Sequence, residues 1–188
     1  MLNSIIQDLN KEISAAQAVV VSGEAGDQFI QVEATSIKAV AEFLKKSFNV
    51  LQAISGVDYP EYFELNYFLT HIDPANPKNA HVKVKLMNKN DPQVDSIVDV
   101  WKSADWQERE CFDMFGIRFA NHPDMRRILC PDDWEGYALR KDYKAATHYR
   151  GMEIYPAHKM NIEDQEFKER QNEISILQNR RSDLDIKG

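Results

Sequence analysis

Cysteine is scarce in this chain, and its scarcity argues against several kinds of protein. Only Cys111 and Cys130 occur among 188 residues. An iron–sulfur cluster held by one chain usually needs four thiolates, and a structural zinc site would need added His or carboxylate ligands. A disulfide-dense secreted fold is excluded. We expect two reduced, inert thiols in a reducing compartment, with a reversible disulfide between them as the alternative.

Long apolar runs and an excess of basic charge are also missing. The longest purely apolar run is Ala18–Val21, far short of the roughly 20 residues that span a bilayer. The first residues show no signal-peptide pattern. Acidic residues outnumber basic ones by 30 to 23, which argues against a nucleic-acid partner. Phosphate-binding glycine loops are absent as well, so we expect a soluble cytosolic protein of one domain, with room for an appendage.

Apolar residues make up 43% of the chain, enough for a real core. Their spacing in residues 1–101 predicts an α+β domain, with a mostly antiparallel or mixed sheet of about five strands and helices on one face, followed by an extended C-terminal arm. Helical spacing occurs in residues 2–13, 35–48 and 94–101. The predicted strands are 19–21, 29–32, 50–54, 61–72 and 80–87, the third of them ended by Gly56.

Residues 105–115 predict a further helix, with Asp105 and Glu108 as a capping box and Gly116 just past its end. Between Ile117 and about Asn161 we find no sustained period, although this stretch is rich in Trp and Tyr. Aromatic side chains in an extended arm need a surface to bury against, so we expect the arm to lie on a partner protein. The predicted divisions are 1–101, a motif helix and arm at 102–161, and a polar tail at 162–188, with a possible helix near 167–177.

Charges of both signs crowd residues 108–144, where fifteen ionisable side chains predict a paired network or, equally, a solvated surface. Arg109 and Asp113 are four apart and are expected to pair. Glu108 and Glu110 point in different directions from a helix, so a catalytic carboxylate pair is not favoured. A metal site at His122, with Asp124 and either Glu108 or Asp113, is an alternative to a plain hydrogen-bonding role.

The most specific feature begins at Glu108. The run 108–117 reads ERECFDMFGI, and 122–129 reads HPDMRRIL. Further matches follow in PDDWEG at 131–136 and LRKDY at 139–143. Over about 36 residues this resembles the signature of the C subunit of respiratory complex I, the proton-pumping NADH:quinone oxidoreductase. Tyr137-Ala138 stand where that family often has His-Pro, and Lys144 stands where it commonly has Pro.

The resemblance implies a non-catalytic subunit that binds no cofactor. It implies packing against the D subunit, which forms the quinone site, near cluster-bearing subunits such as B and I. FMN, iron–sulfur clusters and quinone would belong to those partners, and the chain would be peripheral on the cytoplasmic side of the inner membrane. The assembled complex would pass electrons from NADH to quinone and translocate protons.

The same resemblance implies roles for particular residues. Four of them would fix the motif helix and its ionic network: Glu108, Arg109, Glu110 and Asp113. Nine others would shape the arm against the D subunit: His122, Arg126, Arg127, Asp132, Asp133, Trp134, Arg140, Lys141 and Asp142. Two alternatives stay open, namely the equivalent subunit of a membrane-bound hydrogenase or F420H2 dehydrogenase, and a stand-alone metal-dependent enzyme that uses His122.

Overall fold

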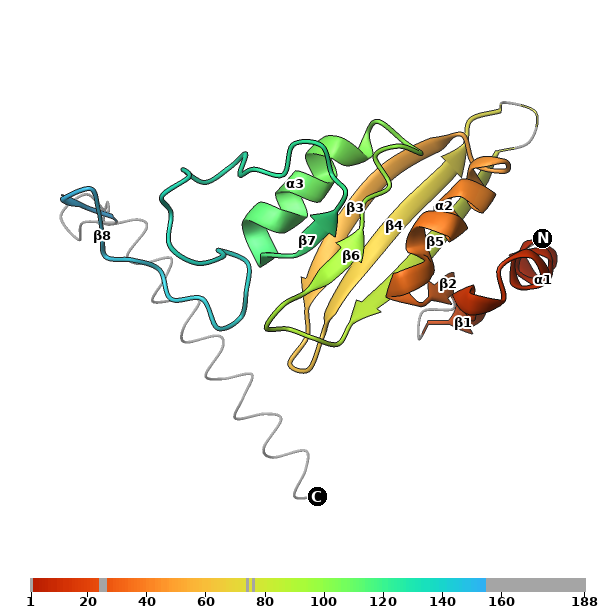
Figure 1. Ribbon diagram of the computed structural model, residues 1–188, viewed down its shortest axis with the longest axis horizontal. Helices are drawn as coiled ribbons and strands as arrows, with labels where there is room; N and C mark the ends of the chain where they lie inside the picture. The colour runs from red at the N-terminus through yellow and green to blue at the C-terminus, as the bar shows by residue number, and fades with distance from the viewer. Residues whose placement is uncertain (1, 24–26, 74, 76, 155–188) are drawn as a thin grey trace, which may run out of the picture. The chain divides into compact units, whose positions relative to one another are not determined.

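The computed structural model describes residues 2–23, 27–73, 75 and 77–154. Their centre is a five-stranded sheet in the order β1-β2-β5-β4-β3 (Figure 1). The strands are β1 Val19–Ser22, β2 Gln28–Val32, β3 Val50–Asp58, β4 Phe63–His71 and β5 Lys78–Leu86. Only the β2–β5 pair is parallel among the four pairings of this sheet. The predicted α+β class with a mixed sheet of five strands is confirmed.

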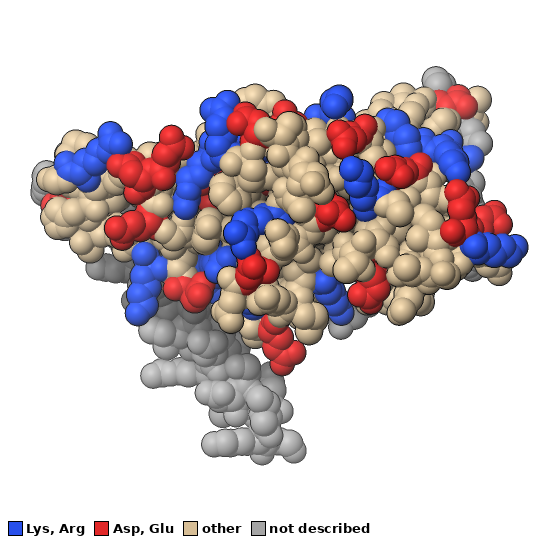
Figure 2. Space-filling view, viewed as in Figure 1, with Lys and Arg blue, Asp and Glu red and all other residues tan. Residues whose placement is uncertain are grey.

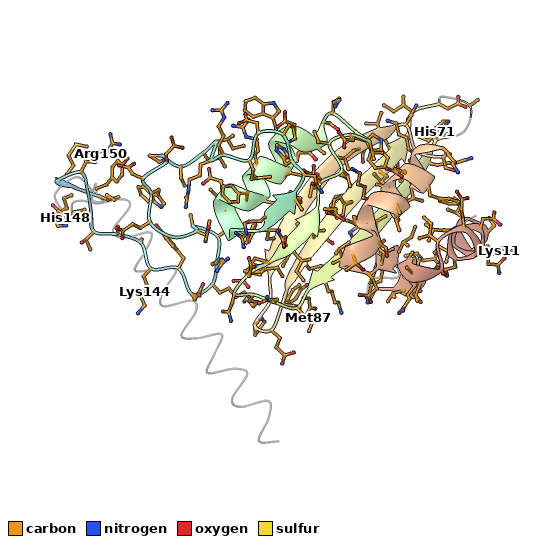
Figure 3. The ribbon with its side chains drawn as sticks, in the orientation of Figure 1. Lys11, His71, Met87, Lys144, His148 and Arg150 are labelled. Atoms are coloured by element: carbon orange, nitrogen blue, oxygen red, sulfur yellow. The ribbon has the colours of Figure 1, made fainter. Side chains whose placement is uncertain are left out.

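The long β4–β5 pair forms the middle of the sheet and sets its two faces. Leu65 lies opposite Val84 and Tyr67 opposite Val82, so alternate residues bring apolar side chains to one face. These four side chains are fully or almost fully buried. His71, at the end of β4, and Met87, just after β5, mark opposite ends of this pair in Figure 3.

Helices α2 (Ile37–Lys45) and α3 (Ala104–Phe115) cover that apolar face. Apolar residues of α2 recur at helical spacing and line one small cavity together with Tyr67 and Val82. On α3, the ring of Phe115 packs edge-on against Phe63 of β4. Both helices therefore lie on one side of the sheet, as the sequence predicts.

Helix α1 (Leu2–Glu12) comes first in the chain and is followed by the short 3-10 turn η1 (Ser14–Ala16). The side chain of Asn10 exchanges two hydrogen bonds with the backbone of Ala18, which fixes α1 at the start of β1. A second 3-10 turn, η2 (Ala34–Ser36), leads from β2 into α2. The helices predicted at residues 2–13 and 35–48 are confirmed as α1 and α2.

Strand β3 does not end where the sequence suggests, because it continues through Gly56 to Asp58. A Cβ at Gly56 would lie 2.8 Å from the ring of Phe115. The glycine therefore permits the close approach of α3 and does not interrupt the strand.

The prediction of a helix after Pro92 is wrong. Residues Gln93–Asp95 form β6, which pairs in parallel with β7 (Arg118–Ala120), and a turn follows at residues 98–100. Val94 and Phe119 lie opposite each other in this pair, and both are buried. The strand partner is more than twenty residues away in the sequence, so local spacing alone favoured a helix.

The chain divides into one compact unit at residues 1–144 and a second at 145–188. Within the first, residues 121–144 form no helix or strand. The described part of the second contains a small hairpin of β8 (His148–Tyr149) and β9 (Met152–Glu153). The tail at 162–188 and the helix near 167–177 lie outside the described residues. The divisions at 101 and 161 stay predictions.

Candidate functional site

Three charged residues of α3 are buried, which is rare for ionic side chains and points to specific partners. Glu108 and Asp113 are fully buried and Arg109 is nearly so. Helix α3 lies along the outer edge of β3, where Ser103 and Gln107 donate side-chain hydrogen bonds to the carbonyl oxygens of Leu51 and Gln52. The helix thus covers a strand edge and carries three charges inward.

Glu108 accepts hydrogen bonds from the segment that follows β6. Its Oε2 receives the hydroxyl of Ser96 at 2.6 Å, and its Oε1 receives the backbone N–H of Ile97 at 2.8 Å. The predicted capping box is therefore wrong, because Glu108 does not turn back toward the helix start. Ser103 precedes the helix and makes no side-chain capping bond.

Burial raises the pKa of the Glu108 carboxyl to about 7, since a charge loses its hydration inside the protein. The hydrogen bonds from Ser96 and Ile97 oppose this shift, and the nearby Asp105 and Asp99 carboxylates add to it. Glu108 is thus poised to exchange a proton near neutral pH.

His122 lies beside Glu108, and its side chain is fully buried. Its Nε2 is 3.4 Å from Asp105 Oδ1 and 3.9 Å from Glu108 Oε2, while its Nδ1 accepts the backbone N–H of Asp124 at 3.0 Å. Asp124 instead turns its carboxylate to Arg126 at 2.9 Å. The geometry gives His122 the role of a hydrogen-bonding residue that seats the turn at 121–124.

Asp113 holds the next part of the arm. Its Oδ2 accepts the backbone N–H groups of Ile128, Leu129 and Cys130 at 3.0, 2.6 and 2.8 Å. Its Oδ1 accepts Arg127 Nη1 at 3.1 Å. Burial alone would raise the pKa of Asp113, but these hydrogen bonds and the guanidinium outweigh it and lower the pKa.

Arg109 does not pair with Asp113, so that expectation is wrong. Its Nε donates to the carbonyl oxygen of Arg126 at 3.3 Å, and its Nη1 lies 3.9 Å from Asp124 Oδ2. Its guanidinium also lies over the ring of Trp106, 5.0 Å from the centroid. Arg109 and Asp113 therefore both bind groups of the arm and not each other.

A second set of contacts fastens residues 137–141 to the end of α3. Arg140 Nε donates to the carbonyl oxygen of Phe115 at 2.6 Å, and its guanidinium lies over the rings of Phe63 and Tyr137. Helix α3 ends at Gly116, which has φ of 73°, and a Cβ there would lie 2.5 Å from the Tyr137 ring. The predicted C-terminal glycine is confirmed, and its small size admits Tyr137.

The backbone N–H of Lys141 donates to Asp58 Oδ2 at 2.8 Å, which joins the arm to the end of β3. Asp58 also binds Lys89. Burial would raise the pKa of Asp58, but the bonds from Lys89 and Lys141 lower it overall. Sequence reasoning missed Asp58, Ser96 and Tyr137, since their partners are distant in the chain and no local spacing marks them.

The other predicted residues are placed toward solvent. Trp134 is half-buried and its Nε1 donates to the hydroxyl of Tyr143 at 3.0 Å. Four acidic residues are exposed: Glu110, Asp132, Asp133 and Asp142. Among the large apolar side chains that are exposed, Trp106, Leu129 and Leu139 belong to α3 or to the arm fastened to it. On the face shown in Figure 2, acidic and basic side chains are interspersed.

Within residues 2–23, 27–73, 75 and 77–154, no group of three or more His, Cys, Asp or Glu side chains is arranged to hold a metal ion. Burial raises the pKa of the Cys111 thiol to about 12, so it stays protonated at neutral pH. Of the helices in these residues, none is long and apolar enough to cross a membrane.

The comparison with known families fits the motif that begins at Glu108. Residues 30–149 match the family described as "Respiratory-chain NADH dehydrogenase, 30 Kd subunit". The chain belongs to this family. The matched range contains α3, the turn at His122 and residues 121–144, so the contacts of Glu108, Arg109 and Asp113 described above lie in the region that defines the family. The resemblance inferred from the motif is confirmed.

Several relatives of this family are similar to the chain. The C subunit of the NADH-quinone oxidoreductase of Maricaulis maris is 36% identical over 152 residues, covering 76% of this chain and 74% of that protein. The C subunit of the Chloroherpeton thalassium enzyme is 42% identical over 126 residues, covering 62% of this chain and 50% of that protein. The chain thus spans about half the length of the Chloroherpeton relative.

One solved structure shares the fold of this 30 kDa subunit family member. A chain of the membrane-bound sulfane sulfur reductase, an archaeal respiratory membrane complex, aligns with a TM-score of 0.61 at 24% identity. The alignment covers 76% of this chain and 85% of that chain. The likeness shows that the two chains share a fold.

Proposed function

We propose that this chain is a structural subunit of an NADH:quinone oxidoreductase and that it packs on the quinone-site subunit, the D subunit, through α3 and the arm. Membership of the 30 kDa subunit family and relatives named as the C subunit support the assignment to such a complex. Neighbouring cluster-bearing subunits such as B and I would lie nearby. The chain would be peripheral on the cytoplasmic side of the membrane, attached only through the complex.

The observation that carries the docking proposal is a rigid surface with exposed apolar side chains. Leu129 and Leu139 are more than half exposed, yet their own backbone N–H groups are bound to Asp113 and to the carbonyl oxygen of Met114. Trp106 is exposed to a similar extent. Preorganised apolar side chains of this kind lower the entropic cost of binding a partner.

Charge around these side chains favours a basic partner surface. The exposed charged residues of α3 and of residues 121–144 are Glu110, Asp124, Arg126, Asp132, Asp133, Glu135, Lys141, Asp142 and Lys144. Acidic residues are twice as numerous as basic ones in this set. Complementary charge would steer association and fix its orientation. We therefore expect Lys and Arg side chains on the quinone-site subunit opposite the arm.

A non-catalytic, cofactor-free role is part of the same proposal. The buried ionic residues Glu108, Arg109 and Asp113 are engaged by the chain's own arm and loops. The FMN, iron–sulfur clusters and quinone would then be held by partner subunits. Electron transfer from NADH to quinone would depend on this chain for assembly and not for chemistry.

Gentle purification of the tagged chain from native membranes tests the assignment. We expect a homologue of the quinone-site subunit and an NADH-binding subunit by mass spectrometry, with flavin and iron–sulfur absorbance. A hydrogenase-type or deazaflavin-type input module would instead assign the chain to the related complexes. Stoichiometric zinc or iron on a chain that elutes alone would contradict the proposal and favour a metal-dependent enzyme.

Variants then test the docking surface. Leu129→Asp and Leu139→Asp place a charge on the proposed interface and should reduce the yield of assembled complex at least tenfold. Ile72→Asp is the matched control, because Ile72 is equally exposed but follows β4 at the end remote from Phe63, the residue against which Phe115 at the C-terminal end of α3 packs. Normal yield from both arm variants would contradict docking through the arm.

A further inference from the structure

Three proton-binding side chains meet inside the protein between α3 and the turn after β7. Glu108 and the side chain of His122 are fully buried, and Asp105 is half-buried. His122 Nε2 faces Glu108 Oε2 at 3.9 Å, Asp105 Oδ1 at 3.4 Å and the Asp105 carbonyl oxygen at 3.3 Å. Within the described residues, Asp105 Oδ1 is buried and accepts no hydrogen bond.

The backbone fixes the tautomer of the His122 ring. Its Nδ1 accepts the N–H of Asp124 at 3.0 Å, so Nδ1 cannot carry a proton while the turn keeps this geometry. Nε2 therefore carries the proton of a neutral ring and directs it toward the Asp105 and Glu108 oxygens. A cationic His122 would require the Asp124 contact to break.

We propose that Glu108, His122 and Asp105 form a buried proton-binding site in which one exchangeable proton resides on Glu108 and stabilises the turn at 121–124 on α3. This inference concerns the chain itself and does not depend on the identity of its partners.

Protonation of Glu108 changes the hydrogen bonding of its carboxyl group. A proton taken from solvent forms an O–H bond at Glu108 Oε2, and that hydroxyl then donates to Ser96 Oγ, 2.6 Å away. The Ser96 hydroxyl hydrogen, which points to Oε2 while Glu108 is ionised, rotates away from it. Ser96 Oγ can accept this bond in addition to the N–H of Val98 at 3.2 Å. Glu108 Oε1 keeps the N–H of Ile97 in both states. Loss of the proton leaves a negative charge beside Asp105, which destabilises the cluster.

The charged groups around Glu108 come from every element packed against it. Asp105 lies on α3, Asp99 follows β6, and both carboxylates act on Glu108. Tyr67 of β4 is fully buried, and its hydroxyl has no hydrogen-bond partner among the described residues. The Glu108 charge contributes to the raised pKa of Tyr67 and to that of Cys111 on α3. None of these groups is cationic, so none of them neutralises the charge of an ionised Glu108. The nearby cations have other partners: Arg109 lies next to Asp124, and Lys38 binds Asp99.

The Ile97 amide offers a direct reporter, because it donates to Glu108 Oε1. In the full chain labelled with 15N, its amide proton shift should titrate with a midpoint near pH 7. Glu108→Gln should abolish this titration while the Ile97 signal remains. Glu110→Gln is the matched control, since Glu110 lies two residues along α3 and is exposed, and it should leave the midpoint unchanged.

The His122 ring supplies the second measurement. Its nitrogen shifts should show the Nε2–H tautomer. Hydrogen exchange at residues 122 and 124–126, corrected for intrinsic rates, should slow as pH falls from 8 to 6. An Ile97 midpoint at the ordinary Glu value near 4.5 would overturn the proposal. A neutral His122 ring that carries its proton on Nδ1 would overturn it equally.

Discussion

The Asp113 carboxylate accepts three consecutive backbone N–H groups of the arm together with the Arg127 guanidinium. We predict that Asp113→Asn lowers the free energy of unfolding by about 3 kcal/mol, because Arg127 loses its carboxylate in a buried setting. Urea denaturation of the purified chain measures this.

Asp132→Asn is the control for that change, because Asp132 is exposed on the same arm. It should alter stability by no more than ~0.5 kcal/mol. Equal stability of the two variants would show that the arm is not held through Asp113.

Glu108 gives the chain a pH dependence of definite sign. Its folded-state pKa of about 7 lies above the ordinary value of 4.5, so the folded chain holds more protons between these values. The free energy of unfolding should therefore fall as pH rises from 4.5 through 7, by on the order of 3 kcal/mol. Chemical denaturation at a series of pH values from 5 to 8 measures the slope, which Glu108→Gln should flatten.

Below pH 4.5 the free energy of unfolding should depend on pH with the opposite sign. The pKa values of Asp58 and Asp113 are lowered from 3.8, so their contribution is present above pH 3.8 and is lost as pH falls through their folded values. A stability that rises steadily from pH 5 to pH 8 in the unchanged chain would contradict the account of Glu108.

The importance of these residues was predictable from the sequence, but their partners were not. The motif marks Glu108, Arg109 and Asp113, yet helical spacing suggested the pair Arg109–Asp113 and a cap at Glu108. In the fold, groups 11 to 17 residues away satisfy all three side chains. Local i,i+4 attraction is weak and yields to several hydrogen bonds to a buried charge.

The end of α3 depends on Gly116, both for its left-handed backbone and for the space that Tyr137 fills. We predict that Gly116→Ala destabilises the chain by more than ~2 kcal/mol, because backbone strain of ~1–2 kcal/mol adds to a clash with the ring. Thermal unfolding followed by circular dichroism measures the loss.

A double variant separates the two causes. Gly116→Ala with Tyr137→Ala removes the ring and should show a smaller cost for the glycine change than the same change beside Tyr137. Equal costs in both backgrounds would mean that Tyr137 does not press on Gly116.

Most elements follow from periodicity, and the exceptions share a cause. The helices at 2–12 and 37–45 and the strands at the centre of the sheet have clear patterns. Strand β6 is only three residues long and is stabilised by its pairing with β7. Strand β3 continues through Gly56, where a side chain would clash with the ring of Phe115. Both features arise from contacts between distant segments, which a local pattern does not contain.

At the scale of the whole molecule, the arm packs partly on the chain itself and partly faces outward. The absence of periodicity between residue 117 and about residue 161 predicted an extended segment. Residues 121–144 indeed form no helix or strand, but the short strands β7, β8 and β9 also lie within that range. Its aromatic and charged residues suggested a partner, yet much of this material packs on the chain's own α3, including Tyr137 and Arg140. The side chains that remain exposed, chiefly Leu129 and Leu139, form the surface that we propose binds a partner.

Cross-linking mass spectrometry of the assembled complex with an amine-reactive reagent tests the central claim that α3 and the arm bind the quinone-site subunit. Lys141 and Lys144 are exposed on the arm, whereas Lys11 and Lys46 are exposed on α1 and at the end of α2. We predict cross-links from Lys141 or Lys144 to the quinone-site subunit and none from Lys11 or Lys46. Cross-links to that subunit from Lys11 and Lys46 alone would contradict the account.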